Sequence, residues 1–217
     1  MSVSREDLLK TATMLVLAAL ALTIWVDWQG VPLPGDLWLI HRIQDGGQLR
    51  DNAYLVNDAG SWVWAPVAGA IILVLLRGRV WRTAAIPSRR EALSAFAAAI
   101  VLWRGDALVK RIIESPRPTI TAGITIDGHF SGYGYPSGHV YDDVLFYGLL
   151  AVLAPAFLPR RLVLPARVVA VAIVICAGPA RIAVGAHWPS DTLGGYLWGG
   201  MMLCIAVWFG RWVAQRR

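Results

Sequence analysis

Long apolar stretches separated by short polar connectors make up most of this 217-residue chain. A helix needs about 20 mostly apolar residues to cross a bilayer. Six stretches approach that length, and we read each as a spanning helix; they cover about residues 11–26, 61–76, 92–109, 139–158, 165–182 and 191–209. The pattern predicts an all-α, polytopic membrane protein whose six transmembrane helices form one bundle, with residues 1–217 as a single domain.

The connector between the first two stretches, about residues 27–60, is long. Within it, residues 37–43 follow the pattern of a short amphipathic helix, with Trp38 at the membrane interface. A structural cap over the bundle is the favoured interpretation, with substrate gating as the alternative. The first apolar stretch ends without a small-x-small cleavage site, so it is predicted to be an uncleaved anchor.

Composition supports the membrane class. Hydrophobic residues make up 57% of the chain and charged residues only 16%, against roughly 25% charged in an ordinary soluble domain. The net charge of +6 could also indicate nucleic-acid binding. The basic residues, however, stand in short clusters beside the apolar stretches, where topology explains them, so no nucleic-acid partner is predicted. Cys176 and Cys204 lie inside apolar stretches and predict neither a disulfide nor a metal site.

The basic clusters also predict an orientation, because cytoplasmic connectors of membrane proteins are enriched in Lys and Arg. One side of the bundle would hold Arg5, Lys10, Arg77, Arg79, Arg82, Arg89, Arg90, Arg160, Arg161, Arg167, Arg211, Arg216 and Arg217. Most carboxylates fall on the other side. We therefore predict a multi-pass protein of the cell membrane with both termini in the cytoplasm.

Three polar segments fall on the predicted outer face, at the ends of the third to sixth stretches. The first runs from Lys110 to Pro118. Its two prolines stop a helix and force extended backbone around Ser115 and Arg117. Taken alone, a snorkelling helix end followed by a basic surface turn also explains this segment.

The second segment is Pro136-Ser137-Gly138-His139, directly before an apolar stretch. Ser137 suits an N-cap, and the free backbone N–H groups of a helix start form an anion site without a metal. His139 in the first turn could donate a proton to a departing oxygen. An ordinary capped helix with a surface histidine is the alternative, and it is favoured for an isolated match.

The third segment runs from Arg181 to Asp191. Pro189 suits the first position of a helix, which puts Asp191 in the first turn and His187 just before it. A carboxylate there can hold one imidazole nitrogen, which fixes the tautomer and leaves the other nitrogen as base or nucleophile. An interfacial histidine beside a helix-start acid is an equally good interpretation of this segment alone.

The combination of the three segments favours chemistry over the separate structural interpretations. Together they supply three cations, a helix start, two histidines and one orienting acid. The cations can neutralise phosphate oxygens, one histidine can attack phosphorus, and the other can protonate the leaving group. The sequence contains no convincing two-metal spacing, so we predict phosphoryl transfer without a metal or other cofactor.

These segments resemble the type 2 phosphatidic acid phosphatase (PAP2) family, with the related haloperoxidases and glucose-6-phosphatases. The family pattern is Lys-x6-Arg-Pro, then Pro-Ser-Gly-His, then Ser-Arg-x5-His-x3-Asp, and the match spans about residues 110–191. The resemblance implies a six-helix core with the active site at the outer ends of helices three to six. One departure is Ala180, where the family has a serine, which removes one hydroxyl donor to phosphate.

The resemblance also implies roles for single residues. His187 would carry the phosphoryl group and be held by Asp191, with His139 as the general acid. Phosphate would be bound by Lys110, Arg117, Ser137, Gly138 and Arg181.

Four further polar residues lie near these segments. Asp106 is four residues before Lys110 on the same helix face and is predicted to position it, whereas Arg104 is predicted to pair elsewhere in the bundle. Asp142 and Asp143 follow the second segment. Our hypothesis is that Asp143 tunes His139, or that both acids repel a second phosphate; they could also simply complement the helix dipole.

The sequence thus predicts a membrane phosphatase that removes the terminal phosphate of a lipid phosphate or lipid pyrophosphate entering from the bilayer. Phosphatidic acid, phosphatidylglycerol phosphate and undecaprenyl pyrophosphate all carry the terminal phosphate that the site would bind. The alternatives are a lipid phosphotransferase, a phosphatase of soluble sugar phosphates, and a phosphate-binding or transport module without turnover. The sequence makes no prediction of oligomeric state.

Overall fold

The computed structural model describes residues 4–47, 52, 53, 55, 57, 63–76, 87–120 and 123–216, and every long regular element within them is a helix. The helices used below are α1 (Arg5–Gln29), α2 (Asp36–Asp45), α4 (Trp64–Leu76), α5 (Arg89–Leu102), α6 (Gly105–Ile113), α7 (Gly138–Phe157), α8 (Arg160–Ala183) and α9 (Pro189–Gln215). The prediction of an all-α fold is therefore confirmed for the described part of the chain.

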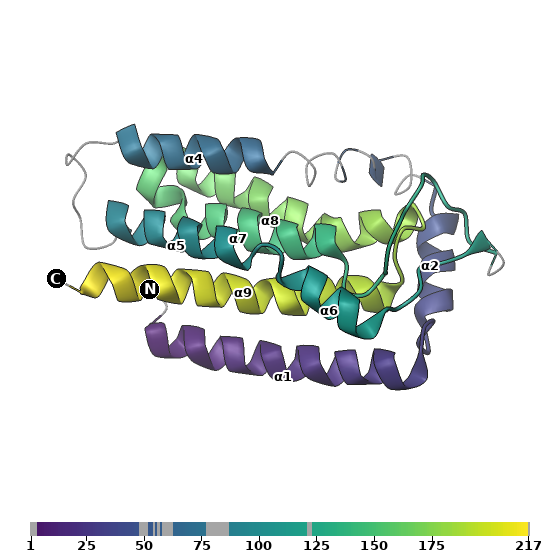
Figure 1. The fold of residues 1–217 in the computed structure, drawn as a ribbon. Coiled ribbons are helices and arrows are strands. Elements are labelled where there is room, and N and C mark those ends of the chain that lie inside the picture. The colour runs from purple at the N-terminus through teal and green to yellow at the C-terminus, as the bar shows by residue number, and fades with distance from the viewer. Residues whose placement is uncertain are drawn as a thin grey trace.

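The long helices run side by side in one bundle, and α2 lies across one end of it (Figure 1). Both termini lie at the opposite end. The central helix is α9, which packs against α1, α5 and α7. Two glycines allow its close approach to α7: a Cβ at Gly195 would lie 2.7 Å from the carbonyl oxygen of Ser137, and one at Gly199 would lie 2.8 Å from that of Tyr141. This packing brings the starts of α7 and α9 together.

Five helical stretches among the described residues are long and apolar enough to span a membrane: α1, α5 with α6, α7, α8 and α9. The second predicted span, residues 61–76, appears as the shorter apolar helix α4, and residues 61 and 62 lie outside the described part. Large apolar side chains such as Met14, Ile24 and Val101 are exposed, as expected on a lipid-facing surface. A multi-pass membrane fold follows, while the count of six spans stays a prediction.

The third predicted span, residues 92–109, falls within the candidate span Arg89–Ile113, which is interrupted near its middle. It breaks after Leu102 and resumes at Gly105. Two side chains of α7 hold the break: the Tyr141 hydroxyl donates to the Leu102 carbonyl at 2.6 Å, and the Trp103 indole donates to Asp142 Oδ2 at 3.2 Å. The break turns α6 so that its last residues reach the start of α7.

The pairing predicted for Arg104 inside the bundle stays a prediction. Its side chain is exposed, and its guanidinium lies 5.5 Å from the ring centroid of Trp103. The amphipathic helix predicted at residues 37–43 is confirmed as α2, with Ile40 fully buried and Trp38 66% exposed. Several of the basic residues used for the orientation lie outside the described residues: Arg77, Arg79, Arg82 and Arg217. So do two carboxylates of the predicted outer face, Asp51 and Asp58.

Candidate active site

All three polar segments meet at the α2 end of the bundle. Lys110 lies in the last turn of α6, Arg117 in the following loop, and Arg181 in the last turn of α8. Ser137 is the N-cap residue of α7, followed by Gly138 and His139 in its first turn; His187 precedes α9, and Asp191 lies in the first turn of α9. The predicted starts of α7 and α9 are confirmed.

Hydrogen bonds tie the segments to one another. The Ser137 amide donates to the Asp191 carbonyl at 2.9 Å, and the Gly134 amide donates to the Ser115 carbonyl at 2.7 Å. The indole of Trp188 donates to the Pro116 carbonyl at 3.1 Å. Backbone and indole contacts of this kind fix the loops against each other independently of the charged side chains.

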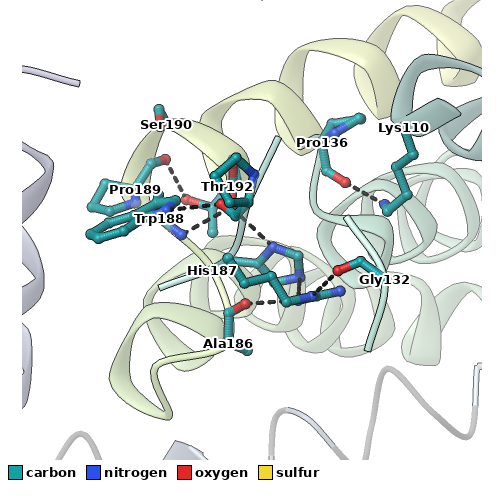
Figure 2. Close-up of polar contacts among 12 residues, drawn as sticks. Lys110, Gly132, Pro136, Ala186, His187, Trp188, Pro189, Ser190 and Thr192 are labelled. Atoms are coloured by element: carbon teal, nitrogen blue, oxygen red, sulfur yellow. Dashed lines mark hydrogen bonds and ion pairs between the residues drawn. The ribbon is translucent and has the colours of Figure 1, made fainter. Parts of the chain in front are cut away.

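His187 is held at both ring nitrogens (Figure 2). Nδ1 lies 3.3 Å from Asp191 Oδ2, and Nε2 lies 3.1 Å from Arg117 Nη1. A guanidinium can only donate, so Nε2 is the acceptor and Nδ1 carries the hydrogen that faces the carboxylate. His187 is 2% exposed and Asp191 fully buried. This arrangement presents an unprotonated Nε2 beside a cation.

The surroundings favour the neutral form of His187. They hold its pKa well below the ordinary value of 6.5. Burial is the first cause, because it penalises the charged imidazolium. The positive groups around the ring follow in this order: Arg117, Arg181, Lys110 and His139. Near neutral pH, His187 is therefore unprotonated and able to act as a nucleophile.

Arg117 is fixed by backbone carbonyls. Its Nε donates to Gly132 at 3.0 Å, and its Nη1 donates to Ala186 at 2.7 Å as well as to His187 (Figure 2). It also lines a cavity of about 410 Å³ whose other walls are Pro118, Ile126, Gly128, His129, Phe130, Ser131 and Gly185. A held guanidinium at a cavity wall is suited to an oxyanion.

Lys110 is fixed in the same way. Its Nζ donates to Asp106 Oδ2 at 3.0 Å and to the Pro136 carbonyl, so the prediction that Asp106 positions Lys110 is confirmed. Gly138 makes room for this pair. A Cβ there would lie 2.8 Å from Asp106 Oδ2 and 3.3 Å from Lys110 Nζ, so the Asp106 carboxylate and the Lys110 ammonium would have to shift.

Three buried donors are left without a protein acceptor within the described residues: Ser115 Oγ, Ser137 Oγ and Arg181 Nε. An unsatisfied buried donor costs about 1–3 kcal/mol. All three belong to segments with predicted phosphate-binding residues. The Arg181 guanidinium is otherwise held 5.2 Å from the ring centroid of Phe130, and its Nη1 lies 3.3 Å from Asn57 Oδ1. These donors fit an anionic ligand.

Asp142 and Asp143 differ in their surroundings. Asp142 accepts from Trp103 and so takes part in the helix break. Asp143 is 2% exposed, and its Oδ1 has no partner in the part of the chain that the structure describes. The hypotheses that Asp143 tunes half-buried His139, or that both acids repel a second phosphate, stay predictions.

Sequence reasoning missed two α2 side chains, Asp36 and Gln44, which contact the α8–α9 connection. Asp36 is one of the carboxylates on the predicted outer face. The only signal in the sequence was their spacing on one face of an amphipathic helix, and that spacing does not identify the partner.

Residues 90–215 match the family model of the PAP2 superfamily, which is more than half of the chain. The protein belongs to this superfamily. Among curated proteins, it is similar to a lipid A 1-phosphatase of Rhizobium etli, at 32% identity over 111 residues that cover 48% of this chain and 44% of that protein. It is also 25% identical over 117 residues to phosphatidylglycerophosphatase B of Bacillus subtilis, covering 52% of this chain and 54% of that one. These alignments span about half the length of the curated relatives.

Two solved structures share the fold. The crystal structure of a transmembrane PAP2-type phosphatidylglycerolphosphate phosphatase from Bacillus subtilis superposes with a TM-score of 0.74 at 19% identity, covering 95% of this chain and 99% of that one. That of Aquifex aeolicus LpxE superposes with a TM-score of 0.54 at 19% identity, covering 78% and 93%. At this identity the likeness concerns the fold alone.

Proposed function

We propose that this protein is a membrane phosphatase that hydrolyses the terminal phosphate of a lipid phosphate or lipid pyrophosphate through a phosphohistidine at His187. The observation that carries the proposal is the pair of contacts at the His187 ring: Asp191 at Nδ1 and Arg117 at Nε2. Such a ring is neutral, oriented, and directed at a group that binds oxyanions.

In the proposed reaction, His187 Nε2 attacks phosphorus and forms the P–N bond as the bond to the leaving oxygen breaks. His139 gives its proton to that oxygen. His139 then takes a proton from the water that attacks the phosphohistidine, which releases phosphate and restores His187. Lys110, Arg117 and Arg181 neutralise the phosphate oxygens, and Ser137 Oγ and the amides at Gly138 donate to them. The three cations do what a metal ion does in other phosphatases, so no metal is required.

The lipid nature of the substrate is inferred from the relatives and from the membrane fold. The curated relatives are named for lipid A and phosphatidylglycerol phosphate, and we propose a phosphorylated lipid of this class that reaches the site from the bilayer. Phosphatidic acid, phosphatidylglycerol phosphate and undecaprenyl pyrophosphate are the first substrates to compare.

We also propose that the site faces the periplasm or exterior, with both termini in the cytoplasm and six spans in all. The location of both termini at the end opposite α2 supports an even number of crossings (Figure 1). A reporter fused to the C-terminus that is fluorescent only in the cytoplasm tests this: a dark fusion would contradict the orientation.

Phosphate release by the purified protein in detergent, with EDTA present, tests the function across the lipid panel. We expect release from at least one lipid, and loss of at least about 1,000-fold in His187→Ala. The matched control is His41→Ala, which changes a histidine at the same end of the molecule but outside the three polar segments. Release that needs added metal, or that survives in His187→Ala, would contradict the mechanism.

A further inference from the structure

Helix α2 presents three residues, each four positions apart, to the segment that carries His187. Residues at this spacing share one helix face. They are Asp36, Ile40 and Gln44. The helix crosses the end of the bundle where α8 ends and α9 begins (Figure 1).

Asp36 binds the start of α9. Its Oδ1 accepts from the Ser190 amide at 3.0 Å, and its Oδ2 accepts from the Ser190 hydroxyl at 2.7 Å and from the Leu33 amide at 2.8 Å. Both Asp36 and Ser190 are 5% exposed. Charge-assisted bonds at a buried site are strong and directional. Because Asp36 satisfies the Ser190 amide, Asp191 Oδ2 is left for the Trp188 amide and His187.

Gln44 holds the other end of the same connection. Its amide nitrogen donates to the Ala183 carbonyl at 3.2 Å and to the Thr125 carbonyl at 2.7 Å, and its amide oxygen accepts from the Thr125 amide at 3.0 Å. Between the two polar residues, fully buried Ile40 packs in a cluster with Ile182 and Trp188. The α8–α9 connection is therefore held before and after His187 and packed in between.

We infer that this face of α2 is a brace that fixes the α8–α9 connection, and that Asp36 and Gln44 are positioning residues for His187. The inference rests on the proposed function for its catalytic consequence. The brace precedes residues 90–215, which match the family model. A displacement of about 1 Å at a reacting atom can cost roughly 100-fold in rate. A loosened connection should therefore lower kcat and leave phosphate binding by Lys110 and the start of α7 largely unchanged, because Lys110 is held by Asp106 and Pro136, outside the connection.

The experiment compares Asp36→Ala, Asp36→Asn and Gln44→Ala with two exposed controls on α2, Asp45→Asn and Arg42→Ala. We expect kcat to fall about 10- to 100-fold in Asp36→Ala with KM within about twofold. Asp36→Asn keeps an oxygen for the Ser190 amide and should recover part of the loss. Gln44→Ala should lose about 10-fold. Unchanged kcat in Asp36→Ala and Gln44→Ala, or a rise in KM alone, would overturn the inference.

Hydrogen exchange in residues 184–191 provides a readout that does not need turnover. Asp36→Ala and Gln44→Ala should speed exchange there at least about 10-fold, whereas the two controls should leave it unchanged. If the wild type releases no phosphate, the proposed function fails. The exchange result still decides whether α2 fixes the α8–α9 connection. Should Asp36→Ala fail to fold, Asp36→Asn and Gln44→Ala carry both measurements.

Discussion

Two helices begin side by side in the candidate site, and their starts are built differently. The start of α9 is occupied by carboxylates: Asp191 accepts from the Trp188 amide at 3.0 Å, and Asp36 accepts from the Ser190 amide at 3.0 Å. The start of α7 has no acid in its first turn, and the Ser137 side chain makes no capping bond within the described residues. The third helical position is Val140 in α7 and Asp191 in α9.

The difference separates two tasks that a helix start can perform. An unoccupied start attracts anions through its free amides and its dipole, whereas a carboxylate already placed there satisfies the amides and repels a second anion. We therefore assign phosphate binding to α7 and orientation of the nucleophile to α9. Four predictions test this division, beginning with the largest effect.

The charge of Asp191 can be removed while its side chain still caps the start of α9. Asp191→Asn keeps an oxygen for the Trp188 amide but loses the charge that orients His187 and stabilises it as it gains positive character. We expect kcat to fall about 1,000- to 10,000-fold, by analogy with the orienting acid of a catalytic triad. The control is Asp7→Asn, because Asp7 holds the same position in the capping box at the start of α1. Less than a 10-fold loss in kcat would contradict the role of Asp191.

A carboxylate can also be added to the start of α7. Ser137→Asp caps the helix and places a negative charge where phosphate is proposed to bind, so KM for the lipid phosphate should rise about 100-fold or more while the thermal stability stays equal or rises. Ser88→Asp makes the same change at the exposed N-cap of α5. An unchanged KM in Ser137→Asp would show that phosphate does not use this helix start.

The close approach at Gly138 provides a smaller test of the α7 side. Gly138→Ala places a Cβ against Asp106 and Lys110, which should displace the Lys110 ammonium and reduce kcat/KM about 10-fold. Gly69→Ala in α4 is the matched control, because its added Cβ would meet nothing within 4 Å among the described atoms. Equal activity in both variants would show that Lys110 does not bind the phosphate.

The smallest expected effect is in the pH dependence. Since burial and nearby cations lower the pKa of His187, the ring becomes protonated only as the pH falls through that lowered value, and the nucleophile is available at every higher pH. The kcat/KM should therefore keep its plateau down to at least pH 6.5. The second ionisation of the substrate, near pH 6 for a phosphate monoester, must be measured separately. If kcat/KM falls to half of its plateau at pH 6.5 or above as the pH is lowered, the pKa of His187 is not depressed.

The sequence was sufficient to predict those features of the structure that depend on residues close together in the chain. Ser137 and Pro189 mark the starts of α7 and α9 because N-cap and first-position preferences act over a few residues. The start of α8 was predicted too late, since Pro165 was taken for its beginning although the helix starts at Arg160. A proline inside a helix lacks the hydrogen bond to the carbonyl four residues earlier, here that of Arg161, so local preferences disfavour this position although α8 contains it.

What the sequence could not provide depends on contacts between distant parts of the chain. The break before α6 is held by Tyr141 and Asp142, 39 residues away from the positions they contact. The bond from Ser190 to Asp36 joins residues 154 positions apart. The pattern of apolar residues indicates which side chains are buried but not which residues they contact. The three polar segments could therefore be identified from the sequence, whereas the contacts of α2 with the α8–α9 connection could not.

The most direct test of the central claim is to trap the intermediate. Purified protein is mixed with radiolabelled lipid phosphate in detergent and EDTA, quenched in alkali, and the labelled peptide is mapped. The account predicts an alkali-stable, acid-labile phosphoryl group on His187 that forms without metal and is absent in His187→Ala. Label on any other residue, or turnover that labels no residue, would contradict it.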